Sequence, residues 1–262
     1  MNTIIQPYAK TSISSKKLAK ALGCKRIAIR RETYRHPQGR KVINWGSQKL
    51  YPGIPETDYI NNPTAIGLAS NKIKTLQKLT EKDVPTLGFT LSRDEAQEKL
   101  DSMEVNAIYV RHSLSTHSGK GIEVVSHGSI VPEAPLYTFD LYKWTEWRLH
   151  VGTKVQGDSL VAHTIRVQQK VRRDKTKRDP GSDPVRNHGA DYVFRVQDLN
   201  IPDERQLVKV GADALTALGL RFGAIDMAHT ADGWKVIEVN TACGLDGATT
   251  VDAYKRYFSE IL

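Results

Sequence analysis

The segment 222–240, FGAIDMAHTADGWKVIEVN, contains two strand-like runs on either side of the turn sequence ADG. Two such runs around a short turn predict an antiparallel hairpin. If residues 231–233 form a three-residue loop, the register places Asp226 directly opposite Glu238. A two-residue Asp-Gly loop would put Asp226 on the other face. The loop length therefore decides which side chains this hairpin brings together.

Polar side chains gather on one face of the expected hairpin. A period of two sends Val236, Glu238 and Asn240 to one face of the second strand and the residues between them to the other. Facing carboxylates destabilise a sheet by roughly 0.2–1 kcal/mol at an exposed site, whereas a divalent cation between them reverses the sign. Two acids and an amide make an oxygen donor set suited to Mg²⁺ or Mn²⁺ rather than zinc. Because such magnesium sites usually include substrate phosphates, the set points to a nucleoside triphosphate. The alternative is a surface hairpin whose acids meet nearby lysines or arginines.

With 262 residues the chain forms one large domain or two small ones, long enough to bury a core without disulfides or metal. Its two cysteines, Cys24 and Cys243, have neither a paired nor a C-x-x-C spacing. The first residues contain no apolar signal core, and no run approaches the about 18 apolar residues of a membrane span. We therefore expect a cytoplasmic protein with no membrane contact.

Positive charge is concentrated in two regions. Residues 1–62 hold 12 Lys and Arg against 3 Asp and Glu, which accounts for the net charge of +9. Residues 166–186 hold 8 basic and 3 acidic side chains. Such patches attract nucleotides, phosphorylated substrates or nucleic acid, although solvated loops and helix faces give the same composition.

Helical and strand-like segments alternate, which favours the α/β or α+β class. Ser14 or Ser15 caps a predicted helix that ends at Gly23, and further helices are predicted from Ser70, Ser92 and Asp203. Strands are predicted at 26–30, 41–45, 106–111, 122–125 and 191–196, and a long segment, 136–152, follows Pro132 and Pro135.

The stretch RHSLSTHSGKGIEVV is the candidate phosphate cradle. A predicted strand delivers Arg111, and the following residues are rich in Ser and Gly. Gly119 and Gly121 allow backbone N–H groups to approach phosphate oxygens closely. The stretch lacks both the P-loop pattern and G-x-G-x-x-G, so an ordinary hairpin loop is the alternative.

The order of these pieces resembles the ATP-grasp superfamily of ATP-dependent carboxylate-amine ligases over residues 62–245. NKIKTLQKL with VPTLGFT is similar to the family's opening helix and the segment that follows it. AIYVRHSLSTHSGKGIEVV is similar to the family's strand, flexible glycine-rich loop and second strand. TEWRLHVG resembles the family's E-y-R-v-h-V segment. GAIDMAHTADGWKVIEVNTACGL resembles the terminal signature, which is the most specific element. The chain looks most like short ATP-grasp proteins of bacteriophages and bacteria.

The resemblance implies an ATP-grasp fold in which two α/β subdomains clasp ATP, preceded by a small α/β pre-grasp domain that helps to hold substrate. On this division, residues 1–62 are a reduced pre-grasp domain. Residues 63–135 are the N-subdomain with the glycine-rich loop, and residues 136–262 are the C-subdomain with the metal site.

The resemblance also implies roles for individual residues. Asp226, Glu238 and Asn240 would hold Mg²⁺ or Mn²⁺. Arg148, Arg166 and Arg172 would be catalytic, and acylphosphate and substrate contacts would come from Arg166, Arg172 and Asn187. ATP contacts would come from Lys72, Arg111, Ser118, Gly119, Lys120, Gly121, Tyr137, Phe139 and Glu146. Arg111 stands where many members have Lys, and Cys243 where relatives often have Pro. Neither departure removes a metal ligand, so a competent enzyme is expected.

The implied reaction joins a carboxylate to an amine or similar nucleophile through an acylphosphate, converting ATP to ADP and phosphate. At least one of the two substrates is expected to be anionic or phosphorylated, because the chain is basic. A kinase-like phosphotransferase on the same ATP site is one alternative. A basic nucleic-acid-binding protein is the other, and it is disfavoured because the sequence has no recognition helix, RNP motif or aromatic stacking strip.

Overall fold

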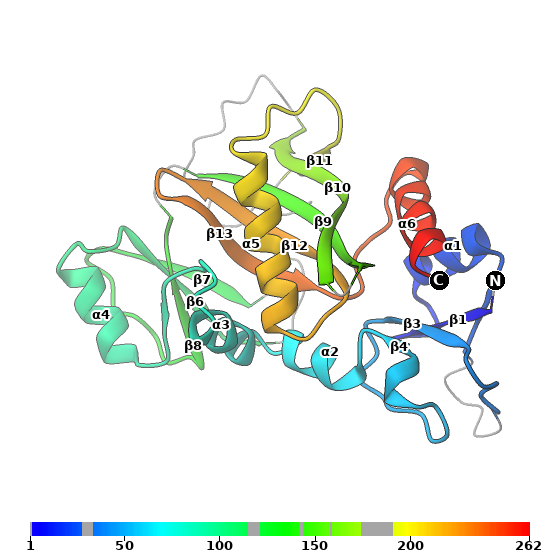
Figure 1. The fold of residues 1–262 in the computed structure, drawn as a ribbon. Coiled ribbons are helices and arrows are strands. Elements are labelled where there is room, and N and C mark those ends of the chain that lie inside the picture. The colour runs from blue at the N-terminus through cyan, green and yellow to red at the C-terminus, as the bar shows by residue number, and fades with distance from the viewer. Residues whose placement is uncertain (1, 28–33, 115–120, 142–143, 158, 174–190) are drawn as a thin grey trace.

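The structure, a computed structural model, describes residues 2–27, 34–114, 121–141, 144–157, 159–173 and 191–262. Within these ranges three β-sheets follow one another along the chain, each with helices packed against it (Figure 1). The mixed α/β class predicted from the alternation of helical and strand-like segments is confirmed.

The N-terminal unit is a four-stranded parallel sheet of order β2-β1-β3-β4. Its elements are β1 Thr3–Pro7, α1 Ile13–Leu22, β2 Lys25–Arg26, β3 Lys41–Trp45, the 3₁₀ turn Glu56–Asp58 and β4 Tyr59–Ile60. The N-cap of α1 is Ser12 rather than Ser14 or Ser15, because the Ser12 hydroxyl accepts from the backbone N–H of Ser15. The helix ends, as predicted, at left-handed Gly23.

The middle unit is an antiparallel sheet of order β5-β8-β6-β7. Its strands are β5 Phe89–Thr90, β6 Ala107–Arg111, β7 Ile122–Ser126 and β8 Leu136–Phe139, and α4 Arg93–Asp101 covers it. Ser92 caps α4 as predicted, accepting from the backbone N–H of Glu95. The two helices before this sheet, α2 Pro63–Ala69 and α3 Lys72–Glu81, pack into the core of the next unit instead.

The C-terminal unit is a five-stranded antiparallel sheet of order β11-β10-β9-β12-β13. The elements are β9 Thr145–Gln156, β10 Ser159–Arg172, β11 Tyr192–Arg195, α5 Glu204–Ala217, β12 Phe222–Thr230, β13 Gly233–Asn240 and α6 Ala248–Ile261. Helix α5 lies across one face (Figure 1), where Trp147, Leu149 and Ile225 join the largest hydrophobic core. Helix α6 packs toward α1 at one end of the other face, together with Phe222 and Ala224.

The closing hairpin forms, but its loop is shorter than predicted. Thr230 pairs with Gly233, which leaves a two-residue turn. The ladder then shifts by one residue at Ile237, so that Asp226 still stands opposite Glu238. This β-bulge also corrects the predicted facing: Val236 packs into the same core as Val239, and Glu238 does not share the face of Val236. Asp226 and Glu238 therefore pair as predicted, but not through the predicted three-residue loop. The bulge compensates for the shorter turn.

The N-terminal unit shares a hydrophobic core with the large sheet. Trp45 is fully buried and stacks on Phe222 with ring centroids 5.6 Å apart. Asn61 donates from its side chain to the backbone carbonyl of Phe222 at 2.8 Å. Lys17 of α1 donates to the carbonyl of Leu245, in the segment that follows β13. These contacts fix the N-terminal unit beside the end of the sheet at which the polar residues gather.

Candidate active site

A row of polar side chains crosses four strands of the large sheet. Gln168 on β10 pairs with Arg148 on β9, Arg148 pairs with Asp226 on β12, and Asp226 pairs with Glu238 on β13. Directly paired residues in a sheet point to the same side. Because the neighbouring residues Trp147 and Leu149 point into the core beneath α5, this row lies on the opposite face. Three of the four side chains were predicted as site residues from the sequence.

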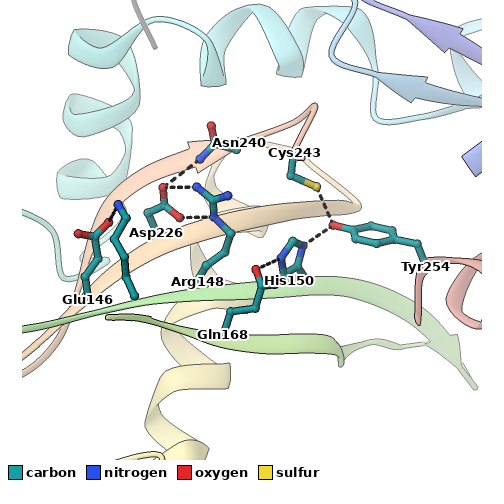
Figure 2. Close-up of polar contacts among 9 residues, drawn as sticks. Glu146, Arg148, His150, Gln168, Asp226, Asn240, Cys243 and Tyr254 are labelled. Carbon is teal, nitrogen blue, oxygen red and sulfur yellow. Dashed lines mark hydrogen bonds and ion pairs between the residues drawn. The ribbon is translucent and has the colours of Figure 1, made fainter. Parts of the chain in front are cut away.

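Arg148 and Asp226 form the central ion pair of this face (Figure 2). The Arg148 Nε donates to one carboxylate oxygen at 2.6 Å and its Nη2 donates to the other at 2.8 Å. The guanidinium also lies over the ring of Phe194, 4.3 Å from its centroid. A planar guanidinium that donates bidentately and is held against an aromatic ring has little freedom to move. Arg148 therefore fixes the orientation of the Asp226 carboxylate.

The same pair sets the charge state of both side chains. Burial would raise the pKa of Asp226, but the adjacent charge and hydrogen bonds of Arg148 outweigh burial and hold that pKa below its usual value. Burial by itself lowers the pKa of the Arg148 guanidinium, but the negative charge and hydrogen bonds of Asp226 have the larger effect and raise it. The aspartate is thus ionised, which metal coordination requires.

Glu238 and Asn240 lie beside this pair at the end of β13. The Asn240 amide donates to Asp226 at 3.4 Å, and the Glu238 side chain is 34% exposed. The ammonium of Lys72 lies 3.8 Å from a Glu238 oxygen. The carboxylate of Glu238 therefore has lone pairs and space available to a further ligand, in contrast to Asp226.

Two cations approach the carboxylates from outside the large sheet. Lys72 is the first residue of α3, where the side chain of Asn71 caps the helix. Arg111 ends β6 of the middle sheet and donates from Nε to the Thr138 hydroxyl at 3.2 Å. Burial lowers the pKa of Arg111, and the negative charge of Glu238 partly offsets this effect. The middle unit and the large sheet thus bring predicted phosphate-binding and metal-binding residues together.

Cations also follow β10 along the same face. Lys170 forms a buried ion pair with Glu146, its partner on β9. Arg172 lies over the ring of Tyr192 at 5.7 Å. Arg166 has neither a hydrogen bond nor an ion pair with any described residue, and its Nε is shielded from solvent. The face is consequently rich in positive charge around a small number of carboxylates, which suits a polyanionic ligand.

Not every predicted ATP contact is brought to this face. Tyr137 is fully buried in the core of the middle sheet, and its hydroxyl donates to the carbonyl of Pro132. Phe139 is only partly buried and lies at the end of β8. Gly121 precedes β7 with a positive φ of 73°, and its carbonyl accepts from the N–H of His112. Ser118, Gly119, Lys120 and Asn187 lie outside the described residues.

A buried chain of hydrogen bonds runs from the polar row to α6 (Figure 2). The His150 Nε2 lies 2.9 Å from the Gln168 Oε1, and its Nδ1 lies 3.0 Å from the hydroxyl of Tyr254. The Cys243 thiol lies 3.1 Å from the same hydroxyl. Burial raises the pKa of this thiol to about 11, so Cys243 is a structural rather than a reactive cysteine.

Sequence reasoning missed Gln168, Lys170 and Phe194. A signal for the first two existed, since Arg166, Gln168, Lys170 and Arg172 recur at every second position, which is the pattern of one strand face. Phe194 had no such signal, because its contact with Arg148 joins strands far apart in sequence.

The donor set of the site fits a hard divalent cation. Among the described residues there is no cluster of three His, Cys, Asp or Glu side chains, so a cation here would rely on two carboxylates and an amide. A carboxylate has about four lone-pair positions. Asp226 uses two of them on Arg148, and Glu238 has a long contact with Lys72 at 3.8 Å. Few protein ligands, all oxygen, are typical of magnesium that also binds substrate phosphates.

Solved structures with the same architecture are ATP-grasp proteins. An ATP-grasp RimK domain protein from Sphaerobacter thermophilus is 12% identical, with a TM-score of 0.61 over 97% of this chain and 98% of that one. A D-alanine–D-alanine ligase from Bacillus anthracis complexed with ATP is 14% identical, with a TM-score of 0.65 over 99% and 94%. The ATP-grasp ligase PsnB, complexed with a phosphomimetic precursor variant, Mg and ADP, is 12% identical, with a TM-score of 0.65 over 100% and 99%.

The chain therefore has the ATP-grasp fold, as the sequence motifs predicted. No protein-family model and no curated protein matches the sequence. No helix in the described part of the chain is long and apolar enough to cross a membrane.

Proposed function

We propose that this protein is an ATP-dependent ligase that joins a carboxylate to an amine or a similar nucleophile. The observation that carries the proposal is the pairing of Asp226 with Glu238, with the cations Lys72 and Arg111 close to Glu238. Carboxylates of the large sheet thus lie close to cations from α3 and from β6 of the middle sheet, and a metal–nucleotide complex would need both kinds of group. The division into pre-grasp domain, N-subdomain and C-subdomain at residues 1–62, 63–135 and 136–262 stays a prediction.

In this proposal Asp226, Glu238 and Asn240 would hold Mg²⁺ or Mn²⁺, and the cation would neutralise charge on the ATP phosphates. Arg148 keeps the Asp226 carboxylate ionised and oriented. Lys72, Arg111 and Gly121 would bind phosphate oxygens, and Phe139 and Glu146 would contribute to the nucleotide pocket. Arg166 and Arg172 supply positive charge where the acylphosphate and the tetrahedral intermediate develop negative charge.

The chemistry needs no side-chain nucleophile. A substrate carboxylate oxygen attacks the γ-phosphorus of ATP, the bond to the bridging oxygen breaks, and ADP leaves. The amine then attacks the acyl carbon of the acylphosphate, loses a proton to solvent and expels phosphate. The excess of cations on the sheet face supports the proposal that at least one substrate is anionic or phosphorylated.

The function is tested by a screen for ADP release over pairs of carboxylates and amines, followed by trapping with hydroxylamine. A hydroxamate that forms only with ATP, Mg²⁺ and the productive carboxylate supports an acylphosphate. ADP release with every productive substrate but no hydroxamate would refute the ligase and favour phosphoryl transfer to a hydroxyl. Glu238→Gln should abolish both signals, whereas Glu260→Gln, which alters an exposed pair with Lys154, should leave them unchanged.

A further inference from the structure

The buried chain from Cys243 to Gln168 has a defined direction. Gln168 presents its Oε1 to the His150 ring, and an amide oxygen can only accept a hydrogen bond. The His150 Nε2 must therefore carry the proton of this contact. Burial lowers the pKa of His150 to about 4, so the ring is neutral near pH 7 and has a single N–H.

The rest of the chain follows from that one proton. Since Nε2 is the donor, Nδ1 is an acceptor and accepts a hydrogen bond from the Tyr254 hydroxyl. The Tyr254 oxygen then accepts from the thiol of Cys243. Tyr254 is completely buried on α6, so its hydroxyl has no water to compete for it. By donating to Nδ1, the Tyr254 hydroxyl stabilises the tautomer of His150 that carries its proton on Nε2. That tautomer in turn keeps the Oε1 end of the Gln168 amide toward the ring.

The arrangement leaves the Gln168 amide nitrogen as a donor without an acceptor. This nitrogen makes no hydrogen bond with the described residues, and it is not among their buried unpaired atoms, so it keeps some access to solvent. Gln168 pairs across the ladder with Arg148, and Arg166 lies two residues before it on β10. The Nε of Arg166 is itself buried without a partner in the described structure. Among the described residues, two donors without a partner, the Gln168 amide nitrogen and the Arg166 Nε, therefore lie close together on β10, which suits an anion.

We propose that Gln168 donates hydrogen bonds from its amide nitrogen to an anionic oxygen of the substrate, and that Tyr254 is a positioning residue that acts through His150. The ligand chemistry is that of a carboxylate or a phosphate group. The inference rests on the proposed function only in identifying the reaction in which this anion takes part. The geometry and its test do not depend on ATP.

The experiment measures the histidine tautomer and anion binding in the same samples by ¹⁵N NMR. The ring nitrogens of His150 report which one is protonated, and the side-chain amide of Gln168 is assigned by its loss in Gln168→Leu. Inorganic phosphate and succinate are then titrated separately at constant ionic strength with chloride. Gln168→Glu keeps the shape of the side chain while replacing its donors with acceptors. Tyr257→Phe is the matched control, because its buried hydroxyl donates to the carbonyls of Thr153 and Arg221 instead.

The expected result has three parts. His150 is protonated at Nε2, and one of the two anions shifts the Gln168 amide signal. Gln168→Leu and Gln168→Glu weaken binding of that anion by about tenfold or more, the value of a hydrogen bond to a charged group. In Tyr254→Phe, a fraction of the molecules should have His150 protonated at Nδ1. Anion binding should then weaken about twofold, because only the remaining molecules keep the Gln168 amide nitrogen toward the anion. Tyr257→Phe changes neither readout.

The proposal is overturned by a wild-type His150 protonated at Nδ1, because the Gln168 amide would then be rotated with its oxygen toward the cations. It is also overturned if neither anion moves the Gln168 signal, or if Tyr254→Phe leaves tautomer and affinity unchanged. A protein that binds phosphate in this way but gains no stability from Mg-ATP would refute the proposed function alone. One that binds Mg-ATP without these effects would refute this inference alone.

Discussion

Replacing Arg148 with Met is expected to destabilise the protein strongly, because it leaves the Asp226 carboxylate buried with little compensation. The substitution removes two charge-assisted hydrogen bonds of 2.6 and 2.8 Å. What remains for Asp226 is the Asn240 amide at 3.4 Å. Two such bonds at about 1.5–3 kcal/mol each, and the measured effect of breaking buried pairs, agree on a loss of about 3–5 kcal/mol at pH 7.

The pH dependence of this loss has a definite sign. In the wild type the pKa of Asp226 is lowered by Arg148, so the pair contributes stability above the unfolded pKa and loses it as pH falls through the folded one. Without Arg148, burial raises the pKa of Asp226, and the variant gains relative stability as the carboxyl group is protonated. The difference between Arg148→Met and wild type should therefore shrink between pH 7 and pH 5.

Urea denaturation followed by tryptophan fluorescence provides the assay. The double variant Arg148→Met with Asp226→Leu should regain much of the lost stability, because no charge is left buried. Lys209→Met is the control, since it breaks an exposed pair with Asp213 on α5 and should change stability by at most about 0.5 kcal/mol. A loss below about 1 kcal/mol in Arg148→Met, or strictly additive single effects, would refute the reasoning.

Three further outcomes follow from the packing and the charge states. Gly46→Ala should lose about 1–3 kcal/mol, because a Cβ there lies 2.5 Å from that of Ala242; Gly53→Ala, with a similar positive φ and no atom within 4 Å, isolates the backbone contribution. Because the pKa of His150 is lowered to about 4, the wild type should lose up to about 3 kcal/mol of stability as pH falls from 6.5 to about 4. Urea denaturation of His150→Gln should lack this part of the pH dependence, and the same loss in the variant would contradict the assignment to His150. Cys243 should resist iodoacetamide at pH 8 until the protein unfolds, as peptide mass spectrometry can determine, and rapid native labelling would contradict its burial.

The closing hairpin shows what local sequence can and cannot determine. The hairpin itself was predictable, because two strand-like runs and a short turn restrict the register to a few choices, but the observed pairing of Asp226 with Glu238 also needs the bulge. The bulge at Ile237 was not, since it exists only because Val236 and Val239 both bury their side chains beneath α5. A strict alternation along the strand therefore gave the wrong face for Val236.

Contacts between distant segments account for the other gaps. The pairing of Arg148 with Asp226 depends on β9 and β12 being adjacent, and no pattern within either strand specifies that neighbour. Likewise, His150 meets Tyr254 only because α6 returns to the sheet after the hairpin. The ATP-grasp motifs predicted a set of site residues, and the sheet order determines which of the described ones touch.

The central claim, that Asp226, Glu238 and Asn240 hold a divalent cation for ATP, is tested most directly by thermal unfolding with Mg-ATP. At about 100 times the dissociation constant, the ligand should contribute about 2.7 kcal/mol, which raises the Tm by roughly 5–10 °C for a chain of this size. The rise should disappear in Glu238→Gln and with EDTA, and it should persist in Glu260→Gln. An unchanged Tm in the wild type, or an equal rise in Glu238→Gln, would contradict the account.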